Sequence, residues 1–195
     1  ILPGLIMMNV ITNAYNNTAS SMLQMKLLQQ IQDMLITPLS NVELALAFII
    51  GGAVRGFVNG ILVLLLGIFI VGMPVEKPFS VILIIFMVSW AFSSIGLVIG
   101  ITAQTWDNIA TMVNFFITPL IFLGGVFYSI NMLPGFWRTI SLVNPIYYLI
   151  NGLRQSVLGV GDTPFSTSLT ASIIMTLLFS SIGIFLFHKG YRIKS

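Results

Sequence analysis

The stretch LALAFIIGGAVRGFVNGILVLLLGIFIV, residues 44–71, decides the fold of this chain. Apart from Arg55, it contains no charged side chain. A helix needs about 20 mostly apolar residues to cross the hydrocarbon core of a bilayer. The stretch therefore predicts a membrane-spanning helix.

The composition indicates that the whole chain is built in the same way. Only 7% of its 195 residues are charged and 57% are hydrophobic, whereas a soluble domain carries about 25% charged residues. Four more stretches predict spans, at residues 2–24, 80–101, 109–127 and 168–187. We therefore expect one all-α domain over residues 1–195, a polytopic transmembrane helical bundle in which five spans are present.

The C-terminal tail sets the expected topology. Its sequence HKGYRIKS follows the last predicted span directly and contains Lys189, Arg192 and Lys194. Lys and Arg beside a membrane helix favour the cytoplasmic side, so the C-terminus is expected in the cytoplasm. Counting back through the spans then places residues 26–43 and 103–108 in the cytoplasm, and residues 72–79 and 128–167 outside.

The start of the sequence predicts a missing helix. The chain begins Ile-Leu-Pro rather than with Met, and the topology above places its first residue outside. One further span ahead of it would return the N-terminus to the cytoplasm. We expect an N-terminally truncated sequence and six spans in the full protein.

Residues 129–159 are an unusual part of the predicted outer region. They are too apolar for a solvated loop, yet Pro and Gly interrupt them too often for a span. Asn144 is a good N-cap, and Pro145 suits the first helical position after it. We expect a re-entrant pair of short helices in the outer leaflet; an ordinary folded extracellular loop is the alternative. Aromatic residues expected at the depth of the lipid headgroups are Trp137, Tyr147 and Tyr148. The residues assigned to the pair are Pro134, Trp137, Asn144, Pro145, Tyr148 and Arg154.

The first predicted span carries polar side chains along one side. At about 100° per residue, these side chains fall within one arc of a helix. On the opposite side lie Ile11, Ala14, Thr18 and Met22. An amide-lined face cannot turn to lipid, because unsatisfied polar groups cost too much there. The face either holds helices together or lines a translocation route, and its length favours the route. The candidate path residues are Asn9, Thr12, Asn13, Asn16 and Ser20.

Small residues predict where helices approach closely. Gly52, Gly56 and Gly60 recur every four residues and form one small-residue face. A similar face on the third span consists of Ser89, Ser93, Gly96 and Gly100. Pro119 is expected to kink the fourth span, because proline interrupts the helical hydrogen-bond ladder.

Arg55 is the one clear charge within a predicted span. A charged side chain near the bilayer centre costs about 2.5–3.5 kcal/mol on insertion scales, so it needs a partner, water or a route to the headgroups. A structural ion pair with Glu43, Asp33 or Asp107 is the favoured interpretation. A substrate-binding charge is the alternative.

No constellation for catalysis is visible. The single His, His188, lies at the end of the last span, and the five carboxylates fall in predicted loops or at helix ends. There is no cysteine, and no Gly-rich loop with Lys-Ser/Thr that would cradle nucleotide phosphates. We predict no catalytic, cofactor or metal site on this chain and no nucleic-acid partner.

The order of features resembles a known family. Four segments carry the resemblance, particularly the run from Leu123 through Pro145 to Arg154. They are LPGLIMMNVITNAYNNTASS (residues 2–21), QDMLITPLSNVEL (residues 32–44), AVRGFVNGILVLLLG (residues 53–67) and ITPLIFLGGVFYSINMLPGFWRTISLVNPIYYLINGLRQSVLG (residues 117–159). They are similar to the permease subunits of ABC type-2 exporters, particularly bacterial permeases related to nodulation-factor, polysaccharide and drug exporters. The resemblance covers essentially the whole chain.

The resemblance implies a function and partners. In that family two permease subunits pair, and each docks a separate ATPase subunit that binds ATP and Mg²⁺. We accordingly expect the permease of an exporter of a polar or amphipathic substrate, of the drug, lipid or glycan class. It would pair with a second copy, contact membrane lipid and lie in the inner membrane of a bacterium. The residues that correspond to the family's ATPase-coupling loop are Gln32, Asp33, Leu35, Thr37 and Pro38.

Two other functions would place different residues in the spans. A partner-free secondary transporter or channel would carry acidic or His residues at mid-membrane, and the predicted spans offer no ionisable group beyond Arg55. A membrane-embedded transferase would need His and carboxylates gathered on one side. The exporter permease is therefore the favoured interpretation.

Overall fold

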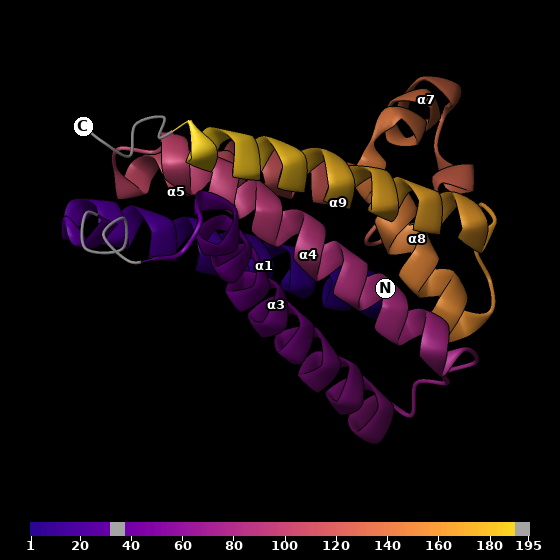
Figure 1. Ribbon diagram of the computed structural model, residues 1–195. Helices are drawn as coiled ribbons and strands as arrows, with labels where there is room; N and C mark the ends of the chain where they lie inside the picture. The colour runs from indigo at the N-terminus through magenta and orange to yellow at the C-terminus, as the bar shows by residue number, and fades with distance from the viewer. Residues whose placement is uncertain (32–37, 190–195) are drawn as a thin grey trace.

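The fold is that of a computed structural model that describes residues 1–31 and 38–189. Within that part every regular element is a helix. The elements are α1 (Leu2–Leu27), α3 (Asn41–Val71), α4 (Pro78–Thr102), α5 (Trp106–Met112), η1 (Val113–Ile117), α6 (Thr118–Leu123), η2 (Ile130–Met132), α7 (Gly135–Val143), α8 (Pro145–Leu158) and α9 (Phe165–His188). Helix α5 and the end of α9 lie at one end of the bundle, and α7 and α8 lie toward the other (Figure 1).

Helix α3 begins and ends where its local sequence directs. The Ser40 hydroxyl accepts a hydrogen bond from the Glu43 N–H at 3.3 Å, and the Glu43 carboxylate accepts one from the Ser40 N–H at 2.7 Å. This reciprocal capping box fixes the first turn. At the other end Gly72 has φ 67°, a left-handed conformation that glycine adopts without steric cost.

Helix α1 lies between the small-residue faces of α3 and α4. A Cβ added at Gly56 would lie 2.6 Å from the Cβ of Ala14, and one added at Gly96 would lie 2.6 Å from the carbonyl oxygen of Tyr15. Both predicted faces are therefore packing surfaces, and α1 is the helix packed against them. Helix α4 also contacts α8 and α9, so α1 and α4 form the centre of the bundle.

The fourth apolar stretch is a helix with an interruption. A π-helical segment, η1, ends at Ile117, two residues before Pro119. Proline has no N–H to donate to the preceding turn, and a π-helical turn is one way in which a helix absorbs such a defect. The stretch runs over Trp106–Leu123 rather than over the predicted 109–127, because the chain turns at Gly125, which has φ 81°.

Four helical stretches among the described residues are long and apolar enough to cross a membrane: α3, α4, the α5–α6 stretch and α9. Helix α1, the remaining one of the five predicted spans, is not among them, although it has 26 residues. The reason is composition, since amides and hydroxyls replace apolar side chains along one side of α1. Four candidate spans are thus observed, and the fifth stays a prediction.

Two short helices, α7 and α8, occupy the region where a re-entrant pair is predicted. The Asn144 side chain between them accepts a hydrogen bond from the Ile146 N–H at 3.0 Å, so the predicted start of α8 is confirmed. Tyr147 is only 1% exposed because α8 packs against α1, α4 and α9, and its expected depth at the headgroups stays a prediction. Trp137 on α7 is 48% exposed. Insertion of the pair into the membrane stays a prediction.

Connections between helices gather at the two ends of the bundle, in the arrangement that the predicted topology requires. The N–H groups of Glu76 and Lys77, between α3 and α4, donate to the carbonyls of Val157 and Ser156 at the end of α8. At the opposite end, the Lys26 ammonium donates to the turn between α4 and α5. Connections expected on one side of the membrane therefore lie at one end of the bundle.

Candidate functional site

The polar face of α1 is turned away from the most tightly packed part of the bundle. Asn16 is exposed, and the other four candidate path residues are half-buried. Ile11, Ala14 and Met22, on the opposite side, are completely buried. The division between a polar and a packed side of α1, predicted from helical periodicity, is confirmed.

Hydrogen bonds of the polar face stay within α1. The Thr12 hydroxyl donates to the Met8 carbonyl at 2.9 Å. The Asn13 amide donates to the carbonyl of Asn9 at 3.0 Å and to its side-chain oxygen at 3.2 Å. Ser20 likewise bonds within the helix, to the Asn17 carbonyl at 3.1 Å. Across residues 1–31 and 38–189, no hydrogen bond from the five candidate path side chains reaches another helix.

The bonds that hold α1 to its neighbours come from other side chains. The Thr18 hydroxyl lies 2.7 Å from that of Ser93 on α4. The Tyr15 hydroxyl donates to the Ile109 carbonyl on α5 at 3.3 Å. Lys26 donates to the Ala103 carbonyl at 2.7 Å. These side chains attach α1 to its neighbouring helices, and the polar face takes no part in these bonds.

Two hollows border α1. The first, which we call the amide groove, has a volume of about 490 Å³. It is lined by Asn13, Asn16, Asn17, Ser20, Trp106, Ile109 and Ala110, from α1 and α5. Asn9 and Thr12 do not line it. The second, which we call the arginine hollow, has a volume of about 300 Å³. It is lined by Asn17, Thr18, Ser21, Met25, Ala47, Phe48, Gly51, Gly52 and Arg55, from α1 and α3.

Arg55 makes no ion pair with a carboxylate of residues 1–31 or 38–189. The Glu43 carboxylate is engaged in the capping box with Ser40. Asp107 lies in the first turn of α5 and does not pair with Arg55 either. Asp33, the remaining candidate partner, lies outside the described residues. Arg55 is exposed and instead lines the arginine hollow.

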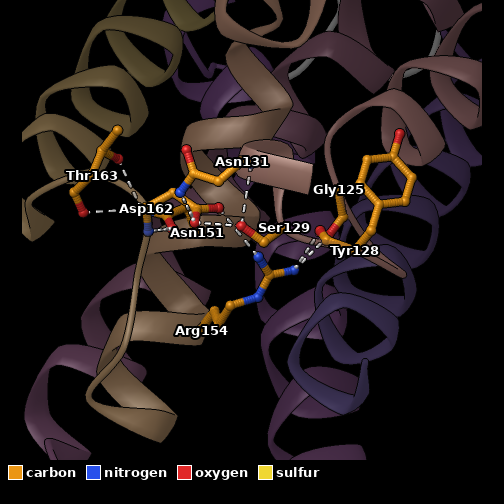
Figure 2. Close-up of polar contacts among 8 residues, drawn as sticks. All are labelled: Gly125, Tyr128, Ser129, Asn131, Asn151, Arg154, Asp162 and Thr163. Atoms are coloured by element: carbon orange, nitrogen blue, oxygen red, sulfur yellow. Dashed lines mark hydrogen bonds and ion pairs between the residues drawn. The ribbon is translucent and has the colours of Figure 1, made fainter. Parts of the chain in front are cut away.

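A polar network fixes the other end of the bundle (Figure 2). Arg154 on α8 forms an ion pair with Asp162, with 3.7 Å between Nη1 and Oδ2. It also donates to the carbonyls of Gly125 and Tyr128. The Ser129 hydroxyl donates to Asp162 Oδ1 at 2.5 Å. The network therefore joins α8 to the segment after α6 and to the connection before α9.

Asn151 extends this network along α8. Its amide donates to the Thr163 hydroxyl at 2.8 Å, and its side-chain oxygen accepts from the Asp162 N–H at 2.8 Å. Of this network the sequence predicted only Arg154 as a site residue. Asp162 could have been recognised as a partner of Arg154 because it is an acidic residue that follows a turn. Gly159, which has φ 70°, marks that turn.

The predicted coupling loop is described only at its end. Gln32, Asp33, Leu35 and Thr37 lie outside the described residues, and Pro38 is exposed just before α3. No three His, Asp or Glu side chains among the described residues come together as metal ligands.

Comparison with known proteins identifies relatives. A family model described as "ABC-2 type transporter" matches residues 1–158. The inner membrane transport permease YadH of Escherichia coli K12 is 39% identical over 195 residues, which is all of this chain and 76% of the relative. Nodulation protein J of Rhizobium meliloti 1021 is 26% identical over 76 residues, covering 39% of this chain and 29% of that protein.

Proposed function

Because this chain belongs to the ABC-2 type transporter family, we propose that it is the membrane-spanning permease subunit of an ATP-driven exporter. The family is one of membrane transport permeases rather than enzymes. We further propose that transport is outward, that a separate ATPase drives it, and that the substrate is polar or amphipathic. The inner membrane of a bacterium is its proposed location, by analogy with the YadH permease, with the C-terminus in the cytoplasm.

The observation that carries the proposal is the open polar face of α1. Amides that serve as interhelical glue should bond to neighbouring helices. Here the Asn13 amide bonds back to Asn9, while Thr18 and Tyr15 attach α1 to its neighbours. The amide groove therefore supports a route for a polar or amphipathic substrate, lined by amide and hydroxyl groups that can exchange hydrogen bonds with it.

The energy for export would come from a separate chain. Permeases of this family normally pair with an ATPase subunit, and ATP and Mg²⁺ would bind to that partner. We place its docking site on the loop between α1 and α3. Replacing Asp33 or Leu35 should uncouple ATP hydrolysis from transport while the permease stays inserted in the membrane. Unchanged coupling in these variants would show that this loop is not the docking site.

The test is reconstitution of the permease in lipid vesicles with and without its ATPase. We expect compounds that stimulate ATP hydrolysis to be transported only when both subunits and ATP are present. A second permease copy is expected in the purified complex. Transport by the permease alone would support the partner-free transporter or channel instead.

A further inference from the structure

The arginine hollow combines a charge with surfaces of two other kinds. Arg55 supplies a guanidinium, and Asn17 and Ser21 supply an amide and a hydroxyl. Phe48 and Met25 supply apolar walls. A hollow of about 300 Å³ with these walls matches an amphipathic ligand better than a purely polar or a purely apolar one.

The charge of Arg55 requires an explanation. Arg55 lies in α3, well inside a helix that is apolar enough to span a membrane, where an ionised side chain is costly unless it is paired or hydrated. No carboxylate of the described residues pairs with it. Guanidinium groups bind phosphates and carboxylates through two parallel hydrogen bonds. An anionic group in the hollow would pair with this guanidinium.

We propose that the arginine hollow is a binding site for the anionic head group of an amphiphile. Arg55 would hold a phosphate, Asn17 and Ser21 would donate to its remaining oxygens, and the alkyl chain would lie against Phe48 and Met25. Asn17 lines both hollows, so a head group bound here would lie at the side of the amide groove. The assignment of the hollow as a transport subsite rests on the proposed function; the anion site itself does not.

The test is photo-crosslinking of the permease–ATPase complex in phosphatidylcholine nanodiscs. The probes are an alkyl phosphate with a diazirine in its chain and the uncharged alcohol of the same chain. We expect the phosphate probe to label peptides that contain Met25 or Phe48. Its half-saturating concentration should rise about tenfold or more in Arg55→Gln, which corresponds to losing one charge-assisted contact. The half-saturating concentration for Arg55→Lys should lie between those of wild type and Arg55→Gln.

Lys77→Gln is the matched control, because it removes the same charge from an exposed residue in the connection between α3 and α4. Equal labelling by the two probes, or equal labelling of wild type and Arg55→Gln, would overturn the proposal. Suppression of labelling by phosphatidylglycerol in the nanodisc would identify a bilayer lipid as the ligand. Suppression only by added alkyl phosphate would identify a transported amphiphile. Labelling that depends on Arg55 in a complex without ATP-driven transport would contradict the proposed function and leave the anion site standing.

Discussion

The hydroxyls of Thr18 on α1 and Ser93 on α4 lie 2.7 Å apart, and Ser93 donates in turn to the Ile49 carbonyl on α3 at 2.6 Å. One buried serine thus joins the three helices at the centre of the bundle. Both hydroxyl-bearing residues are almost completely buried, so neither can exchange its partner for water.

Ser93→Ala is expected to destabilise the permease. It removes a bridge between three helices, and interhelical hydrogen bonds in membranes contribute about 0.6–2 kcal/mol. The measurement is thermal unfolding in detergent. Ser181→Ala is the control, because the exposed Ser181 hydroxyl bonds only to the Leu177 carbonyl of its own helix. Equal unfolding temperatures for the two variants would contradict the bridging role of Ser93.

Gly56→Ala is expected to separate α1 from α3. The new Cβ would lie 2.6 Å from that of Ala14, and overpacking of this kind costs about 1–3 kcal/mol. Gly51→Ala in the same helix should be neutral, because nothing lies within 4 Å of its Cβ position. Thermal stability of the two variants checks the prediction, which fails if Gly51→Ala is the more damaging.

Arg154→Met is expected to loosen the network at the α7–α8 end. Its loss leaves the Asp162 carboxylate, 12% exposed, without its ion-pair partner, and breaking a buried pair costs about 3–5 kcal/mol. The residual exposure places the expected loss at the lower end of that range. A double-mutant cycle with Asp162→Asn measures the coupling free energy. Additive effects of the two substitutions would show that the pair is not coupled.

The features that could be predicted from the sequence are those that depend on residues close together along the chain. The N-cap at Asn144 and the small-residue face at Gly56 both involve neighbours along one helix, and both are observed. The pairing of Arg154 with Asp162 depends on how the chain returns after α8, which periodicity does not show. The burial of Tyr147 likewise depends on which helices surround α8.

Lys26→Met is expected to impair coupling. Lys26 lies in the last turn of α1, ahead of the predicted coupling loop, and donates to the carbonyls of Ile101 and Ala103 at 2.6 and 2.7 Å. Hydrogen bonds to charged groups contribute about 1.5–3 kcal/mol. The substitution should lower the amount of substrate transported per ATP hydrolysed, and Lys26→Arg should restore part of it. Lys77→Met is the control. An unchanged ratio of substrate transported to ATP hydrolysed in Lys26→Met would limit Lys26 to a structural role.

The most direct test of the amide groove as the route is transport by Asn13→Leu/Asn16→Leu in vesicles that contain the ATPase. We expect export to fall strongly while the amount of folded permease and its unfolding temperature stay close to wild type. Gln24→Leu is the matched control, since Gln24 is an exposed amide of α1 outside the lining of the groove. Normal export by the folded double variant, or loss of folding with normal export by the remainder, would contradict the account.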